Sequence, residues 1–163
     1  MALNDAPAEH PGQVWVDADA CPAPIRQILF RAAQRTHCPV TLFANHPLSV
    51  PNLDWVRFVQ VPSGIDVADS EIVERVGAGD LVVTQDIPLA AAVVDLGAEA
   101  VGPRGEPYTR ETVRQRLSMR NFMTELRDTG VRTGGPAPLG NADKQRFANL
   151  LDRWLARRAA SHR

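Results

Sequence analysis

The sequence predicts a three-layer α/β/α sandwich with a central, mainly parallel sheet of about five strands and helical elements at its C-terminal end. Two observations carry this prediction. Short β-branched apolar runs alternate with amphipathic segments of helical period, and Gly and Pro residues separate them. The chain has 163 residues, a length typical of one domain with a sizeable core. Its apolar fraction of 44% and charged fraction of 23% are those of an ordinary globular protein.

The predicted strands are short and apolar. The first is at 14–16, where three large apolar residues in a row indicate a strand buried on both faces. The other strands are predicted at 40–44, 56–61, 80–86 and 98–101. Helices are predicted at 22–35, 65–76, 88–96, 109–127 and 141–155. Pro22 favours a helix start, because proline loses no hydrogen bond at the first helical position, while Gly77 and Gly97 each end a helix. Residues 102–107 are predicted to form a turn.

A single domain is expected at residues 13–156, between a flexible N-terminal arm at 1–12 and a basic C-terminal tail at 157–163. The arm has neither a basic n-region nor an apolar h-region, so we expect no secretory signal. Cys21 and Cys38 are too few for a disulfide framework. Together these features predict reduced thiols and a cytoplasmic protein. No apolar run is long enough to cross a bilayer.

Aspartates follow two of the predicted strands. Asp17 and Asp19 come directly after the first strand, and Asp86 ends the fourth. In parallel sheets of this kind, ligands bind outside the carboxyl ends of the strands where the strand order reverses. If the first and fourth strands flank that point, these three carboxylates converge. Asp66 and Asp69 open the helix after the third strand, and their i, i+3 spacing lets both face the same crevice.

Such a cluster of carboxylates predicts a divalent cation site, with Asp17, Asp19, Asp66, Asp69 and Asp86 as candidate ligands for Mg²⁺ or Mn²⁺. Repulsion between close carboxylates is relieved by a cation or a proton. A structural alternative stays open, in which Asp86, Asp66 or Asp69 caps its helix or interacts with the helix dipole.

Several other features argue against competing chemistries. The four histidines lie outside the acidic motifs, which argues against zinc and against a Ser-His-Asp triad. Asp80 is expected to be a turn residue at the opposite end of the sheet. Cys21 is expected to be an inert packing thiol whose pKa is raised by the neighbouring acids. The loop at 134–140 has phosphate-loop glycine spacing, but Asn141 stands where lysine is required.

Charge is distributed unevenly along the chain. Residues 1–102 carry 5 basic and 13 acidic residues, whereas residues 103–163 carry 13 basic and 6 acidic ones, and Lys144 is the single lysine. Arginine suits bidentate contacts to phosphate, so this half predicts a nucleic-acid-binding surface. The candidate residues are Arg104, Arg116, Arg120 and Arg132. In the alternative, these arginines pair with acids of the other half or form a solvated face.

Three segments resemble the signature segments of the bacterial YaiI/YqxD family: WVDADACPAPIR, GDLVVTQDIPLAA and TGGPAPLGNADKQRFANLLDRWL. The resemblance extends from Gln13 to Leu155. That family is in turn similar to PIN-like domains, which are metal-dependent nucleases with an acidic cluster at the carboxyl edge of a parallel sheet. The resemblance implies a PIN-like sandwich with Asp17, Asp69 and Asp86 as catalytic acids, and with Asp19 or Asp66 as additional ligands.

The leading functional prediction is metal-dependent phosphodiester hydrolysis, with RNA favoured over DNA by analogy with that superfamily. One alternative is a phosphatase of the haloacid-dehalogenase type, because Asp17 and Asp19 after a first strand mimic its nucleophile motif. The other alternative is a non-catalytic module that binds nucleic acid or protein on the same fold. The sequence leaves the oligomeric state open.

Overall fold

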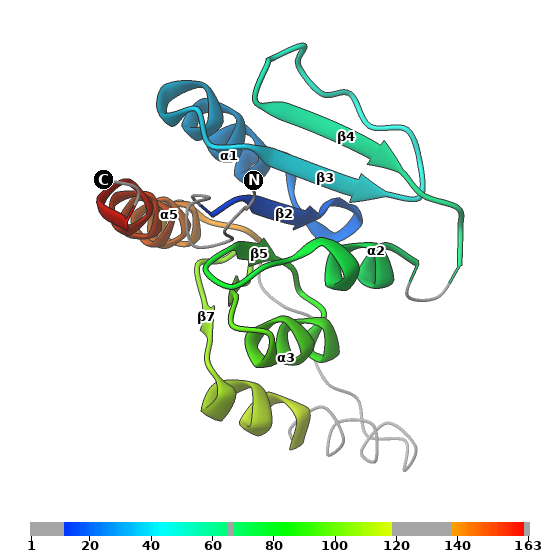
Figure 1. Cartoon of the computed structure of the whole chain (residues 1–163), viewed down its shortest axis with the longest axis vertical. Coiled ribbons are helices and arrows are strands. Elements are labelled where there is room, and N and C mark those ends of the chain that lie inside the picture. Colours follow the sequence, from blue (N-terminus) through cyan, green and yellow to red (C-terminus); the bar gives the residue numbers. More distant parts are fainter. Residues whose placement is uncertain (1–11, 65–66, 119–137, 162–163) are drawn as a thin grey trace, which may run out of the picture.

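A six-stranded sheet runs through the middle of the molecule (Figure 1). The structure is a computed structural model, and it describes residues 12–64, 67–118 and 138–161. The strand order is β4-β3-β2-β5-β6-β7, parallel throughout except for β7, which runs antiparallel to β6. The strands are β2 (Val14–Asp17), β3 (Val40–Ala44), β4 (Val56–Gln60), β5 (Leu81–Val83), β6 (Glu99–Val101) and β7 (Pro107–Tyr108).

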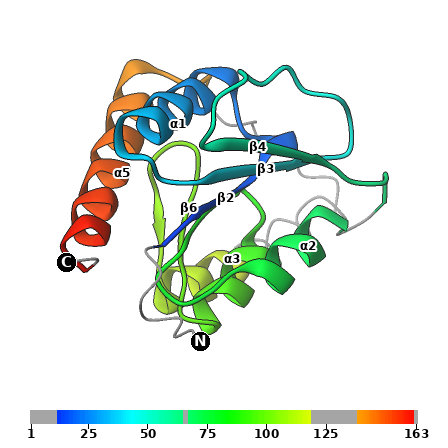
Figure 2. The same cartoon turned by 45° about the horizontal axis from the view of Figure 1, so that its top comes forward.

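Helices cover both faces of the sheet, which confirms the three-layer α/β/α sandwich. The helices are α1 (Ala23–Thr36), α2 (Val67–Arg75), α3 (Ile87–Asp95) and α5 (Asn141–Ser161), with a helical segment at 110–118 and a short 3₁₀ turn, η2 (Ala18–Ala20). Figure 2 shows the sheet nearly edge-on, with α1 and α5 on one face and α2 and α3 on the other. None of the described helices is both long and apolar enough to cross a membrane.

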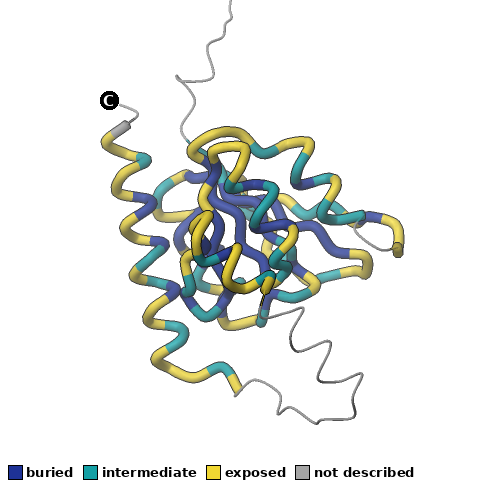
Figure 3. Tube along the Cα trace, turned by 90° about the horizontal axis from the view of Figure 1, so that it is seen from below, coloured by how far each residue is buried: buried dark blue, intermediate teal, exposed yellow. Residues whose placement is uncertain are grey.

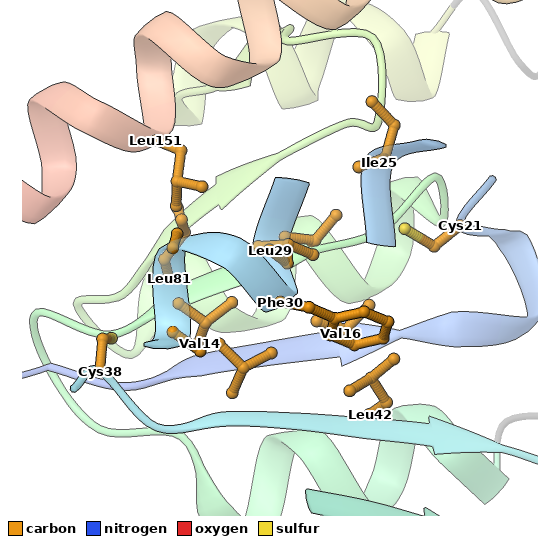
Figure 4. Close-up of a cluster of buried hydrophobic side chains, with 14 of the residues drawn as sticks. Val14, Val16, Cys21, Ile25, Leu29, Phe30, Cys38, Leu42, Leu81 and Leu151 are labelled. Atoms are coloured by element: carbon orange, nitrogen blue, oxygen red, sulfur yellow. The ribbon is translucent and has the colours of Figure 1, made fainter. Parts of the chain in front are cut away.

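The core consists of two apolar layers, one on each face of the sheet. Along β2, Val14 and Val16 belong to the layer under α1 and α5, whereas Trp15 belongs to the layer under α2 and α3. Figure 4 shows Val14 and Val16 among Leu29 of α1 and Leu151 of α5. The innermost strands are therefore buried on both faces, as the dark tube in Figure 3 shows, and this explains their continuous apolar sequences.

Asp80 ties the amino edge of the sheet together. Its carboxylate accepts hydrogen bonds from the indole Nε1 of Trp15 at 2.8 Å and from the backbone N–H groups of Gln13 and Gly77 at 2.9 and 2.8 Å. Asp80 is 7% exposed, so these three donors replace the water that the carboxylate loses on burial. The sequence prediction of a turn residue at this end of the sheet is correct in place but understates its role.

The structure departs from the sequence predictions at three places. The strand predicted at 80–86 is limited to Leu81–Val83, and Asp86 caps α3 instead of ending the strand. The predicted turn at 102–107 contains the start of β7, whose two residues pair with β6. The predicted tail at 157–163 is helical as far as Ser161, because Arg157 pairs with Glu99 and Arg158 donates to the Gly12 carbonyl. Residues 1–11 of the N-terminal arm, the second half of the predicted helix at 109–127 and most of the loop at 134–140 lie outside the described residues.

The Asp80 network yields a stability prediction. Asp80→Ala should lower the free energy of unfolding by about 3 kcal/mol, because it leaves a buried indole N–H and two backbone donors without an acceptor. Asp80→Asn should lose less, since an amide oxygen still accepts.

The measurement is urea denaturation, with Asp152→Asn as control. Asp152 forms an exposed pair with Arg35, so its loss should cost about 0.5 kcal/mol or less. Equal losses in the Asp80→Ala and Asp152→Asn variants would show that the network is not a structural anchor.

Candidate functional site

The order of the strands brings the ends of β2 and β5 together at the carboxyl edge of the sheet. From β2 the chain proceeds outward to β3 and β4, and it then returns to β5 on the other side of β2. The connections that leave the carboxyl ends of β2 and β5 therefore run in opposite directions along the sheet. This leaves a crevice between the two strand ends, as expected where the strand order reverses. A pocket of about 150 Å³ lies at this edge of the sheet. It is lined by Asp17, Asp19, Asn45, Val61, Pro62, Gly64, Val67, Ala68, Asp69 and Asp86.

Asp17 ends β2 and is held by a residue that the sequence prediction missed. The hydroxyl of Thr84 donates to Oδ2 of Asp17 at 3.0 Å, and the same hydroxyl oxygen accepts from the backbone N–H of Asp86 at 2.9 Å. Thr84 is 1% exposed and follows β5 directly. It therefore connects the ends of β2 and β5. The sequence signal that could have identified Thr84 is its place between the apolar run at 81–83 and Asp86.

Burial raises the pKa of Asp17 above its ordinary value of 3.8. The hydrogen bond from Thr84 opposes this shift, while the charges of Asp19 and Asp86 add to it. The direction of the shift shows that the described surroundings of Asp17 do not compensate its negative charge. A carboxylate in such surroundings favours either a proton or a cation.

Asp19 sits in η2 and is held by the residues that follow β3. Its Oδ2 accepts from the backbone N–H of Asn45 at 3.0 Å, and its Oδ1 lies 2.7 Å from Nδ1 of His46. His46 lies outside the acidic motifs of the sequence, but the fold brings its imidazole against Asp19. Sequence spacing could not reveal this contact, because it depends on the pairing of β2 with β3.

Asp86 serves as a helix cap while it lines the pocket. Its Oδ1 accepts from the backbone N–H of Leu89 at 3.0 Å, so the alternative of a capping role is correct for this residue. Asp69 lies in the first turn of α2 and also lines the pocket. The structure thus brings four of the five candidate ligands to one pocket, whereas Asp66 lies outside the described residues.

The donors in the pocket have the right chemistry for a hard cation, but they do not form a ready ligand set. Carboxylate oxygens are the ligands that Mg²⁺ and Mn²⁺ prefer. Within residues 12–64, 67–118 and 138–161, no group of three His, Cys, Asp or Glu side chains is arranged to hold a metal ion. Two of the carboxylates are turned toward backbone donors, Asp19 toward Asn45 and Asp86 toward Leu89.

The candidate phosphate-binding arginines have acidic partners. Nη1 of Arg104 lies 2.8 Å from Oδ2 of Asp143, and Arg116 contacts Glu106. Both partners belong to the basic half of the chain, so these two arginines are paired, but not with acids of the other half as the alternative expected. Arg120 and Arg132 lie outside the described residues.

Cys21 lies beside the site but is 4% exposed. Burial raises the pKa of its thiol to about 12, and the charge of Asp17 makes the smallest contribution among the causes. An unreactive thiol therefore agrees with the structure, although burial outweighs the acids as its cause.

Fold and pocket together define an α/β protein with an acidic crevice at the carboxyl edge of a parallel sheet. The chain belongs to the family described as Uncharacterized BCR, YaiI/YqxD family, whose model matches residues 15–157. No solved structure matches the chain significantly.

Three relatives, each named only as a UPF0178 protein, illustrate the similarity. The protein from Xanthomonas oryzae pv. oryzae is 65% identical over 146 residues, which cover 90% of this chain and 91% of the relative. The protein from Xanthomonas campestris pv. campestris is 64% identical over 148 residues, with 91% and 92% covered. The protein from Halorhodospira halophila is 63% identical over 146 residues, with 90% and 97% covered.

The raised pKa of Asp17 yields a pH prediction for the metal-free protein. Because the folded pKa lies above the unfolded value of 3.8, ionisation of Asp17 weakens folding once the pH passes 3.8, and this penalty is complete above the folded pKa. Asp17→Asn should therefore raise the urea midpoint at about pH 7, and the gain should shrink toward zero as the pH falls to about 4.

The measurement is urea denaturation in a chelator across that pH range. Asp152→Asn, which removes an exposed charge elsewhere, should show no such trend. A midpoint lowered at neutral pH by Asp17→Asn would instead identify Asp17 as a hydrogen-bonded structural residue.

Proposed function

We propose that this protein is a metal-dependent phosphodiesterase that cleaves RNA at the aspartate pocket. The observation that carries the proposal is the convergence of Asp17, Asp19, Asp69 and Asp86 on one pocket at the β2–β5 edge. The raised pKa of Asp17 supports it, because burial and the charges of Asp19 and Asp86 disfavour the ionised carboxylate, which a bound cation would stabilise.

Asp17, Asp69 and Asp86 would hold Mg²⁺ or Mn²⁺, with Asp19 or Asp66 as additional ligands. When bound, such a cation supplies Lewis-acid stabilisation of charge on the scissile phosphate and lowers the pKa of water. The protein's own contribution is to position the carboxylates. Thr84 fixes the orientation of the Asp17 carboxylate, and Leu89 N–H fixes that of Asp86. Because the described carboxylates do not form a ready ligand set, binding of a cation would require them to move closer together.

The phosphatase alternative is less well supported. A haloacid-dehalogenase-type mechanism needs a lysine near its aspartates, and the single lysine of the chain is Lys144. Lys144 lines a groove between α1 and α5 and is not among the residues that line the aspartate pocket. The non-catalytic alternative differs from the proposal only in the absence of turnover, so activity measurements separate the two.

The central test is metal binding and RNA cleavage by wild type and by Asp17→Asn and Asp86→Asn. Mn²⁺ should raise the melting temperature of the wild type, because a ligand that binds only the folded state stabilises it. Wild type should also cleave single-stranded RNA with Mn²⁺, and both variants should lose the thermal shift and the cleavage. Asp95→Asn removes an exposed aspartate paired with Arg110 and should keep both. A full Mn²⁺ shift without cleavage would favour the binding module.

Thr84 yields a second test of the site. Thr84→Val keeps the shape of the side chain but removes the donor to Asp17, and this should lower kcat about 10- to 100-fold. Thr84→Ser keeps the hydroxyl and should recover most of the rate. Because Thr84→Val can also destabilise the protein, melting temperatures accompany the kinetics. Equal kcat values for the Val and Ser variants would show that the hydroxyl does not position the carboxylate for catalysis.

A further inference from the structure

Most cations of the described chain already have partners. Seven arginines form ion pairs: Arg35, Arg75, Arg104, Arg110, Arg116, Arg146 and Arg157. Arg26 and Arg158 donate to the backbone carbonyls of Cys21 and Gly12. Within the described ranges, five cationic side chains have neither an acidic nor a hydrogen-bonded partner, and these are Arg31, Arg57, Arg114, Lys144 and Arg153.

Two of these five cations meet in one groove. Arg31 of α1 and Lys144 of α5 line a groove of about 520 Å³ between the two helices. The remaining lining residues are Pro24, Gln27, Ile28, Asn141, Gln145 and Ala148. The described lining therefore holds two positive charges and no carboxylate. An anion can bind these cations without displacing an existing ion pair, whereas at Arg104 or Arg116 it would have to compete with Asp143 or Glu106.

The groove opens at the same edge of the sheet as the aspartate pocket. Helix α1 begins directly after β2 and η2, which carry Asp17 and Asp19. Helix α5 begins at this edge too, because Arg104, three residues after β6, pairs with Asp143 in the first turn of α5. Figure 2 shows α1 and α5 as neighbours on the same face of the sheet.

The residues of α1 that line the groove form a stripe leading away from this edge. Pro24, Gln27, Ile28 and Arg31 follow one another at i, i+3, i+4 and i+7, so they share one face of the helix. Seven residues of helix span about 10 Å. Arg31 therefore lies about 10 Å along α1 from Pro24, and a ligand that reaches from the aspartates to Arg31 must be a chain rather than a single phosphate group.

We propose that the α1–α5 groove binds the sugar–phosphate backbone of the single-stranded RNA whose scissile linkage occupies the aspartate pocket. This rests on the proposed function, since the groove is the second contact of the same substrate. Arg31 and Lys144 supply the phosphate contacts, and the amides of Gln27 and Asn141 line the path between the two helices. The strand crosses the edge of the sheet over the first turn of α1.

The test compares binding of a fluorescent oligouridylate of about 12 nucleotides to wild type, to Arg31→Gln/Lys144→Gln and to Arg114→Gln/Arg153→Gln. Both double variants remove two cations without an ion pair, but only the first removes them from the groove. Affinity is measured by anisotropy between about 50 and 200 mM salt. The groove variant should bind more weakly. The slope of its log affinity against log salt concentration should become shallower by about 1.4, since each of two lost single-strand phosphate contacts contributes about 0.7.

The control variant should bind as the wild type does, and both variants should keep the wild-type melting temperature and Mn²⁺ shift. Equal losses in the two variants, an unchanged groove variant, or a wild type that does not bind the oligonucleotide at low salt would overturn the groove proposal.

Cleavage of the dinucleotide UpU separates this proposal from the proposed function. UpU is too short to reach Arg31, so the groove variant should cleave it at the wild-type rate. If wild type binds the oligonucleotide through the groove but cleaves neither substrate, the groove is an RNA-binding site, whereas the proposed function and the shared substrate are both refuted. If wild type cleaves UpU but binds the long strand independently of the groove, the proposed function stands and the groove proposal fails.

Discussion

The pairing of β2 with strands on both sides is the constraint on which the rest of this structure depends. β2 is parallel to β3 and to β5, and Val14 and Val16 are 1% and 0% exposed. A strand enclosed in this way cannot satisfy its backbone except through both neighbours. The chain therefore leaves β2 toward one side and returns on the other. The crevice that receives Asp17 and Asp86 is a consequence of that topology rather than a separate feature of the fold.

Asp17 and Asp80 show how two carboxylates at opposite edges of one sheet can differ in purpose. Asp80 accepts three N–H hydrogen bonds, including the one from the Trp15 indole. Asp17 accepts one hydroxyl hydrogen bond within the described chain and faces the charges of Asp19 and Asp86. The surroundings of Asp80 complete its hydrogen bonding, whereas those of Asp17 leave negative charge unbalanced. Of the two, only Asp17 therefore has a physical reason to bind something that the chain does not supply.

The sequence predicts most of the fold because its signals are local. Buried strands appear as apolar runs. Asp17 ends β2 and Asp86 follows β5 as the cap of α3, so their convergence follows once the sheet is assumed parallel. β7 was unpredictable because two residues carry no periodicity. The contact of His46 with Asp19 and the bridging role of Thr84 depend on which strands are neighbours. The last turn of α5 depends on distant partners of Arg157 and Arg158, which a local pattern does not contain.

The charge pattern shows that composition alone does not identify which cationic side chains are free of acidic partners. The C-terminal half is strongly basic, and composition alone points to its many arginines as a phosphate-binding surface. Arg35, Arg110 and Arg157 form ion pairs that join the two halves of the chain, and Arg104, Arg116 and Arg146 pair with acids inside the basic half. A phosphate approaching a paired arginine gains little, because it replaces one carboxylate partner with another anion. The relevant quantity is the charge that folding leaves without a partner, and among the described residues Arg31 and Lys144 bring two such charges into one groove at the edge that carries the aspartates. For the RNA binding that we propose, these two cations would decide where on the surface the strand lies.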